Sequence, residues 1–281
     1  MGDPVKNPKS QWQKSKRGII AALVVTLLGI GIGALRFSRE DGDKAWERIF
    51  ERGVLTVATD ASYPPFAAVD ENGALFGFDI DLAEEIGRRL GVRAEFENIA
   101  YDALLSTLVS GRDDVVISAF VPQPARLREV SYTRPYFISG TAAVIRREGD
   151  ARLTDDPAQW ASGKTLSVEY GAGGEALARR WARRAPGVTV LPRPTAAEAL
   201  QAVEAKDADA ALVDAISAYD FLRAHPALIL AGPPLESEPY VIAVSSQSPM
   251  LHRALENTLA DMEADGALTG LKVKWFGEAA R

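Results

Sequence analysis

The feature that most constrains the fold is an alternation of short apolar runs and helical patterns, which begins at Gly53. The apolar runs have the length of strands, and the segments between them repeat apolar residues at helical spacing. Such alternation predicts βαβ units, in which helices cover both faces of a parallel sheet. We therefore expect an α/β body with strands at 54–59, 92–98, 114–118, 141–146, 165–168, 188–191, 210–213 and 240–245, and helices at 79–90, 103–110, 174–184, 196–205, 216–224, 249–264 and 267–276.

An uncharged segment precedes this body. Residues 18–35 carry no charge, and as a helix they would extend roughly 27 Å, close to the about 30 Å of a bilayer core. Residues 1–17 have five basic residues and one acidic residue, which predicts that this end stays in the cytoplasm. The residues after Ala34 fit a cleavage site poorly, although Gly31 and Gly33 offer an alternative cut.

We therefore expect an N-terminal transmembrane helix that serves as an uncleaved signal anchor at 18–36. It follows a basic cytoplasmic tail at 1–17 and precedes a charged tether or short helix at 37–52. This order places the body in the periplasm or on another extracytoplasmic face, anchored in the cytoplasmic membrane, or secreted if the segment is cut.

Composition excludes several kinds of partner and site. Residues 36–281 contain 27 basic and 37 acidic residues, which argues against nucleic acid because phosphate binding needs clustered Lys and Arg. The chain has no cysteine, so it has neither disulfides nor a thiolate metal site. Two histidines, His225 and His252, are too few for a histidine-rich metal centre. We expect no nucleic-acid partner, no metal and no cofactor.

The informative side chains follow the ends of predicted strands. In open α/β sheets, ligands bind outside the carboxyl ends of the strands, where loops and helix N-termini collect. Those ends lead into four segments of mixed aromatic, polar and glycine residues, at 60–66, 119–126, 169–174 and 214–215.

The first two segments offer aromatic rings and a cation. The prolines of DASYPPF, 60–66, present Tyr63 from a rigid loop, as a wall for a small ligand or as a buttressing turn. Tyr101, at the start of the next helix, either faces the same space or packs there. Arg126 follows SAFVPQPA and could hold a carboxylate by two parallel hydrogen bonds, or pair with Glu129 at the surface.

The last two segments offer backbone N–H groups and a carboxylate. The glycines of EYGAGGE, 169–175, let the backbone approach an anion, but dinucleotide and P-loop patterns are absent from the sequence. Asp214 could receive an ammonium group or cap the helix that starts at Ile216. Together with Arg126 it would suit the two ends of an α-amino acid, because burying an unpaired charge is very costly.

Residues 53–277 resemble the bacterial extracellular solute-binding proteins of family 3, the receptors of polar amino-acid ABC importers. The runs that carry the resemblance are RGVLTVATDASYPPF, GFDIDLAEEIGRRLG, YDALLSTLVSGRDDVVIS, PARLREVSYTRPYF, GKTLSVEYGAGGEA, DADAALVDA and DGALTGLKVKWFG. The resemblance implies a two-lobed, type II periplasmic-binding-protein fold with two crossover hinge strands. Lobe 1 would comprise 53–141 plus 240–281, and lobe 2 would comprise 142–239.

The resemblance also implies roles for single residues. Arg126 matches the arginine that binds the ligand's α-carboxylate, and Asp214 matches the aspartate that binds its α-ammonium group. Tyr63 and Tyr101 match the aromatic pair that sandwiches the ligand side chain. Gly173 falls where the family usually has Thr, whose backbone N–H also helps to hold the carboxylate.

Two carboxylates, and one departure from the family's residue pattern, bear on which ligand is bound. Asp60 and Glu169 fall where members with basic ligands contact the side chain, although Asp60 could instead order its loop and Glu169 could face solvent. Residues 119–123, beginning with Ala119, replace the small and hydroxyl residues usual there. A lost hydrogen bond to a charged group costs on the order of 1.5–3 kcal/mol. Either Gln123 and backbone groups compensate, or the ligand is not an ordinary α-amino acid.

Three functions remain open from the sequence. The first is a membrane-anchored receptor without catalytic residues, which captures a basic or other polar amino acid between its lobes and delivers it to an ABC transporter permease. The second is a lyase on the same scaffold, similar to cyclohexadienyl or arogenate dehydratases, with Glu169 as general acid. The third is a non-transport sensor.

Overall fold

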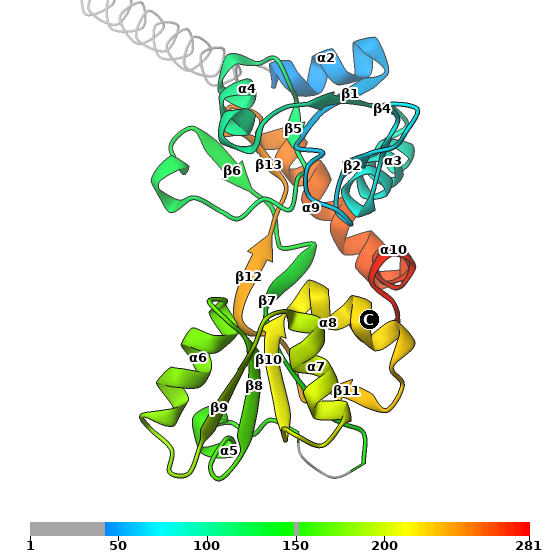
Figure 1. Cartoon of the computed structure of the whole chain (residues 1–281). Helices are drawn as coiled ribbons and strands as arrows, with labels where there is room; N and C mark the ends of the chain where they lie inside the picture. Colours follow the sequence, from blue (N-terminus) through cyan, green and yellow to red (C-terminus); the bar gives the residue numbers. More distant parts are fainter. Residues whose placement is uncertain (1–42, 149–151) are drawn as a thin grey trace, which may run out of the picture. The chain divides into compact units, whose positions relative to one another are not determined.

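Two β-sheets organise the chain (Figure 1). The structure is a computed structural model that describes residues 43–148 and 152–281, and residues 45–281 form one compact unit. Within the described residues, no helix is long and apolar enough to cross a membrane. The anchor expected at 18–36 and the tail at 1–17 lie outside them.

The first sheet, with the helices packed on it, forms lobe 1. Its strand order is β4-β1-β5-β13-β6, in which β4, β1 and β5 are parallel and β13 pairs antiparallel with both β5 and β6. The strands are β1 (Val54–Thr59), β4 (Arg93–Asn98), β5 (Val115–Val116), β6 (Val130–Tyr132) and β13 (Ala243–Ser245), with a hairpin of β2 (Ala68–Val69) and β3 (Leu75–Phe76). The helices are α2 (Lys44–Arg52), α3 (Phe78–Leu90), α4 (Leu104–Ser110), α9 (Pro249–Ala264) and α10 (Ala267–Phe276), with the 3₁₀ turns η1 (Tyr101–Ala103), η2 (Pro124–Arg126) and η3 (Glu278–Ala280).

The second sheet, with its helices, forms lobe 2. Its order is β11-β7-β10-β8-β9, and β10, β8 and β9 are parallel. The strands are β7 (Phe137–Arg146), β8 (Thr165–Glu169), β9 (Thr189–Arg193), β10 (Ala210–Asp214) and β11 (Leu228–Leu230). The helices are α5 (Pro157–Trp160), α6 (Gly173–Ala182), α7 (Ala196–Glu204) and α8 (Ala215–Ala224).

Two antiparallel strands connect the sheets. Strand β12 (Leu235–Tyr240) pairs with the first half of β7, with Tyr240 opposite Phe137 and Leu235 opposite Thr141 (Figure 1). The strand expected at 240–245 is divided into β12 and β13. The division arises because the N–H of Val241 donates to the Phe120 carbonyl and that of Ile242 to Thr133 Oγ1, so both leave the strand ladder.

The sheets are mixed where the sequence analysis predicted parallel ones. The prediction holds for the three strands of each sheet that alternate with helices, and the antiparallel strands belong to segments that cross or return between lobes. Of the tether or short helix expected at 37–52, residues 44–52 form helix α2. In α2, Ile49 is fully buried in the core and Arg48 pairs with the buried Asp114. This helix therefore packs on the body.

Candidate functional site

The loop after β1 is built around the carboxylate of Asp60. Oδ1 accepts the N–H of Ser62 (3.0 Å) and Oδ2 accepts the N–H of Tyr101 (2.9 Å). The N–H of Asp60 donates to Ser118 Oγ (2.9 Å). Asp60 therefore ties together the segments that follow β1, β4 and β5. This is the loop-ordering alternative that the sequence analysis left open. It fixes the backbone from which Tyr63 and Tyr101 project.

Two exposed tyrosines each stand on a buried phenylalanine. Tyr63 is 46% exposed and its ring stacks on Phe66 at 5.4 Å, while Phe66 is 1% exposed. Tyr101 is 41% exposed and stacks on the fully buried Phe120 at 5.3 Å. A packed ring beneath each tyrosine limits its rotation, so both present a fixed aromatic face to solvent.

These residues meet around one hollow of ≈ 320 Å³. It brings together Asp60, Tyr63, Tyr101 and Ala119, four of the residues singled out in the sequence. No cationic side chain of the described residues lines it. Ser62 and Val121 also line it, from the segments 60–66 and 119–126 singled out in the sequence. Ser118 and Tyr240 were missed, because a hydroxyl residue at a strand end carries no distinctive pattern.

The turn after β5 is held by a buried carboxyl group. Ala119 has a left-handed φ of 43°, and its N–H donates to Asp79 Oδ2 (2.6 Å) and to the Tyr136 hydroxyl (3.0 Å). The Tyr136 hydroxyl also donates to Asp79 Oδ1 (2.9 Å). These contacts fix the backbone at the floor of the hollow.

Two backbone N–H groups after the Ala119 turn donate to tyrosine hydroxyls. The N–H of Val121 donates to the Tyr101 hydroxyl (3.4 Å), and the N–H of Gln123 donates to the Tyr132 hydroxyl (3.2 Å). Phe120 is buried between the rings of Tyr101 and Tyr132 and does not line the hollow. These two backbone N–H groups are therefore engaged within the chain.

Arg126 lies on η2, outside the lining of this hollow. Its Nε and Nη2 both contact Glu129 Oε2, at 2.8 and 2.6 Å, and the two side chains are 36% and 48% exposed. The structure thus shows the surface pair that the sequence analysis left open. Such an exposed pair contributes only about 0–1 kcal/mol. A ligand carboxylate could therefore replace or share it at low cost.

The other predicted residues lie at the carboxyl edge of the lobe 2 sheet. Glu169 ends β8, Asp214 ends β10 and Gly173 begins α6. Asp214 Oδ1 accepts the N–H of Ser217 (2.8 Å), so this carboxylate caps α8. Thr141 on β7, which the sequence analysis missed, is the strand partner of Asp214 on β10. The Oγ1 of Thr141 lies 3.9 Å from the position that a Cβ would take at Gly173.

The glycine loop before α6 is rigid. The N–H of Gly171 donates to Glu175 Oε2 (2.7 Å), and Arg179 Nε holds the other oxygen of Glu175 (2.9 Å). A Cβ at Gly174 would lie 2.1 Å from the Leu212 carbonyl oxygen, so α6 packs on β10 at a distance that only glycine permits. The start of α6 is thereby held against β10.

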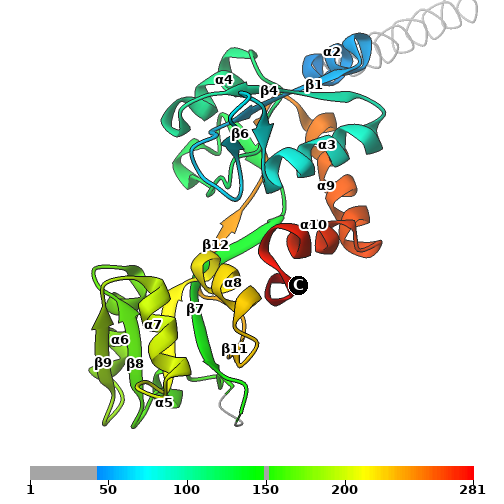
Figure 2. The same cartoon turned by 45° about the vertical axis from the view of Figure 1, so that its right-hand side comes forward.

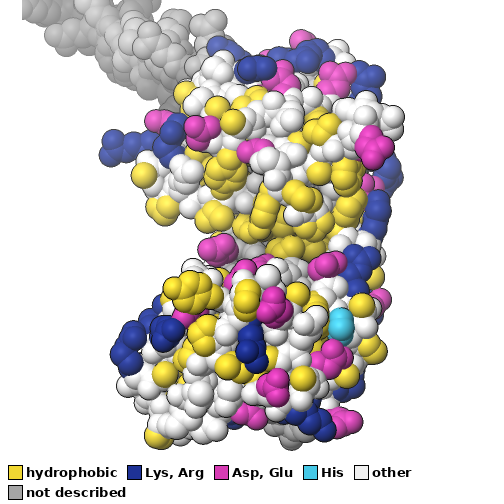
Figure 3. Space-filling model, viewed as in Figure 1, with side chains coloured by type: hydrophobic (Ala, Val, Ile, Leu, Met, Phe, Trp, Pro, Cys, Tyr) yellow, Lys and Arg dark blue, Asp and Glu magenta, His cyan; other side chains and the backbone are white. Residues whose placement is uncertain are grey.

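The crossing strand β7 connects the two edges. Tyr240, which lines the hollow, pairs with Phe137 of β7. Asp214 pairs with Thr141, which is four residues after Phe137 on the same strand. At about 3.3 Å per residue these positions are roughly 13 Å apart along β7. Figure 3 shows this face hollowed at the level of the crossing strands, with hydrophobic side chains (yellow) on its lobe 1 side. Within the described residues, no group of three or more His, Cys, Asp or Glu side chains could hold a metal ion.

The sequence pattern of the bacterial extracellular solute-binding proteins, family 3, matches residues 55–278. The chain belongs to this family. It is 29% identical over 266 residues to the L-cystine-binding protein TcyJ of Escherichia coli (strain K12), which covers 93% of this chain and 96% of that protein. The family resemblance seen in the sequence is confirmed.

Solved structures agree on a two-lobed α/β fold. The L-cystine solute receptor of Neisseria gonorrhoeae, in its unliganded open conformation, has a TM-score of 0.71 and 25% identity, over 83% of this chain and 97% of that chain. An ancestral cyclohexadienyl dehydratase has a TM-score of 0.68 and 26% identity, over 82% of this chain and 95% of that chain. The scaffold therefore occurs in both a receptor and an enzyme.

Proposed function

We propose that this chain is an extracytoplasmic receptor, anchored in the cytoplasmic membrane through 18–36, that captures an amino acid and delivers it to an ABC transporter permease. The observation that carries the proposal is the hollow at Tyr63 and Tyr101, one short stretch of β7 away from Asp214. The weakly paired Arg126 follows the lining residue Val121 by five positions in the chain. The name of TcyJ, an L-cystine-binding protein, supports an amino-acid ligand.

The ends of the amino acid would be held by charged and backbone groups. Arg126 has donors beyond the two that contact Glu129, and these would bind the α-carboxylate together with the N–H of Gly173. Asp214 Oδ2 is not used by the helix cap, so it would accept the α-ammonium group. Bringing these groups together requires closure of the lobes about β7 and β12, with the ligand favouring the closed state.

The side chain of the amino acid would occupy the hollow. Tyr63 and Tyr101 would contact its two faces, with Ala119 at the floor. Asp60 is the one lining carboxylate among the described residues, and Glu169 stands at the opposite edge. A cystine-like or a basic side chain fits this combination of rings, hydroxyls and acidic groups.

Calorimetric titration of the full-length protein with the twenty amino acids and cystine tests the proposal. We expect one of them to bind, and Arg126→Ala to weaken its binding by about 10- to 100-fold, because a hydrogen bond to a charged group contributes about 1.5–3 kcal/mol. Arg128→Ala, an exposed arginine of the same segment, is the matched control and should bind normally. Absence of any amino-acid binding would contradict a receptor and favour a sensor. Equal affinities of the two variants would contradict the role of Arg126 in holding the carboxylate.

The likeness to the ancestral dehydratase keeps a lyase as the second candidate. Glu169 would be its general acid, since its side chain has no hydrogen-bond partner among the described residues. Turnover of prephenate or arogenate that Glu169→Gln abolishes would favour this candidate over the receptor.

A further inference from the structure

A second hollow, of ≈ 700 Å³, lies where lobe 2 meets the end of the chain. Its walls come from α8 and β11 and from α10 and η3, and α8 contacts both α10 and η3 (Figure 2). It shares no lining residue with the hollow at Tyr63 and Tyr101. A role for it is therefore separate from the proposed amino-acid site.

Three arginines line this hollow. Arg147 Nε donates to the Pro226 carbonyl (2.9 Å), and Arg223 Nη1 donates to the Trp275 carbonyl (3.0 Å). Neither of these two, nor Arg152, forms an ion pair with a carboxylate of the described residues.

The lining therefore carries an excess of positive charge. Glu278 is the one acidic lining residue among those described, and it pairs with Arg281 at 3.4 Å. The planar donor fork of a guanidinium matches the oxygens of a carboxylate or a phosphate.

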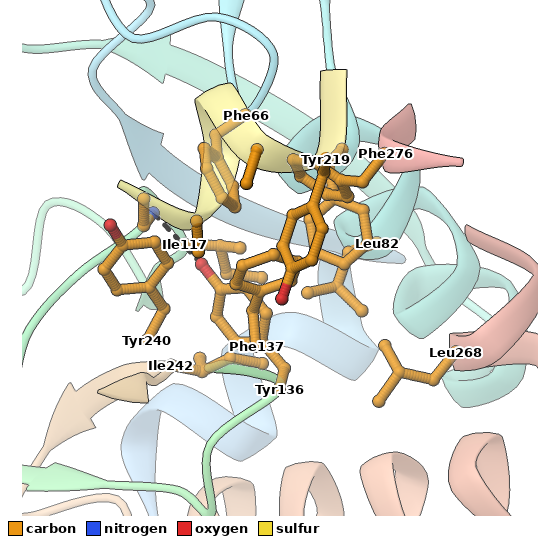
Figure 4. Packing of buried hydrophobic residues seen from close by; sticks show 14 of the residues in the cluster. Phe66, Leu82, Ile117, Tyr136, Phe137, Tyr219, Tyr240, Ile242, Leu268 and Phe276 are labelled. Atoms are coloured by element: carbon orange, nitrogen blue, oxygen red, sulfur yellow. Dashed lines mark hydrogen bonds between the residues drawn. The ribbon is translucent and has the colours of Figure 1, made fainter. Parts of the chain in front are cut away.

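A tyrosine whose ring is buried also lines the hollow. Tyr219 is 5% exposed, and its ring packs edge-on against Phe137 and Phe276, at 6.2 and 6.3 Å (Figure 4). Its hydroxyl has no hydrogen-bond partner among the described residues, and burial raises its pKa, so it stays a neutral donor. An anion in the hollow could therefore accept a hydrogen bond from this hydroxyl.

The rest of the lining is largely apolar. Hydrocarbon side chains come from both walls: Leu222, Leu228, Ile229, Leu230 and Val273. A volume of ≈ 700 Å³ lies within the range of small-molecule sites. We propose that this hollow binds an organic anion, with its carboxylate or phosphate head at Arg223 and the Tyr219 hydroxyl, which are four residues apart on α8, and its apolar body along the aliphatic wall toward Arg147.

Octanoate, monooctyl phosphate and 1-octanol have similar apolar chains and different head groups. Comparing their affinities therefore distinguishes the contribution of the anionic head from that of the apolar body. Titrated calorimetrically into the full-length protein, at least one anion should bind at least tenfold more tightly than octanol, and the better of the two identifies the head group. Tyr219→Phe keeps the ring packing and should weaken that anion about three- to tenfold, without changing octanol. The double variant Arg147→Gln, Arg223→Gln should remove the preference for anions.

Arg183→Gln is the matched control, because Arg183 is exposed and does not line the hollow. It should bind the anion as the unmodified protein does. The proposal is overturned if neither anion binds, if octanol binds as well as the anions, or if Tyr219→Phe binds the anion with unchanged affinity. Tyr219→Phe decides the outcome even if the double arginine variant fails to fold.

Discussion

Asp79 is the residue whose environment departs most from its usual one. It is buried under the Ala119 turn, where it accepts hydrogen bonds from the Ala119 N–H and the Tyr136 hydroxyl. Burial raises its pKa to about 7, and the two hydrogen bonds only partly offset this. The carboxyl group therefore carries a proton in the folded protein at mildly acidic pH, where it would be ionised in the unfolded chain.

The sign of the pH dependence follows from this. The folded pKa of Asp79 lies above its ordinary 3.8, so its contribution to stability is largest below about pH 4 and is lost as the pH rises to about 7. Asp79→Asn, which mimics the protonated form, should remove this decline. Urea unfolding at intervals from pH 4 to 8 measures it, with Glu84→Gln, on the exposed side of α3, as control. A decline of equal slope in Asp79→Asn would show that another group titrates.

At this scale the sequence could supply residue types and positions but not partners. Asp60, Arg126 and Asp214 each had two interpretations, and the structure shows the intramolecular contact for all three. Those contacts do not use every donor or acceptor, so ligand binding stays a prediction for each. The role of Asp79 was missed because its partners are 40 and 57 residues away in the chain.

Among the elements, the pair of crossing strands depends on a glycine. Gly140 in β7 has a φ of 128°, and a Cβ there would lie 2.7 Å from the Glu236 carbonyl oxygen and 2.8 Å from that of Leu235. Glu236 itself has a φ of 47°, at the register shift in β12. Two backbones thus approach too closely for any side chain at this point.

Gly140→Ala should therefore lower the free energy of unfolding by more than the unfavourable backbone conformation alone would. Gly73→Ala is the control, because Gly73 has a φ of 82° but no atom within 4 Å of its Cβ position. Its free energy of unfolding should fall only by the about 1–2 kcal/mol that a left-handed conformation costs an alanine. Gly140→Ala must also push β12 away from β7, so its free energy of unfolding should fall further. Chemical denaturation of both variants tests this, and equal losses would mean that β12 yields freely.

Elements with strong periodicity were predicted well, and short or polar ones were not. The helices at 79–90, 196–205 and 249–264 agree with α3, α7 and α9 within one residue at each end. Strand β12, LESEPY, has no apolar alternation because it is exposed along much of its length, so only its pairing with β7 defines it. The hairpin β2–β3 has two-residue strands, which are too short for any period to show.

For the whole molecule, one aromatic cluster spans both lobes and the crossing strands (Figure 4). Phe137 on β7 contacts Phe66 of lobe 1 at 5.2 Å, Phe276 of α10 at 4.6 Å and Tyr219 of lobe 2 at 6.2 Å. A second cluster, around Trp160 and Trp181, lies within lobe 2 alone. The shared cluster is therefore the core that makes the stability of one lobe depend on the other.

Removing Phe276 should separate the lobes energetically. The side chain is 2% exposed and packs on rings from both lobes, so Phe276→Ala should cost about 3–5 kcal/mol and divide a single thermal transition into two. Leu177→Ala, in the lobe 2 cluster, should cost about 2–5 kcal/mol yet keep one transition, because the shared cluster remains intact. Differential scanning calorimetry of the full-length variants distinguishes these outcomes. If Phe276→Ala still melted in one transition with equal calorimetric and van't Hoff enthalpies, the lobes would be coupled through the strand pair β7–β12 rather than through these rings.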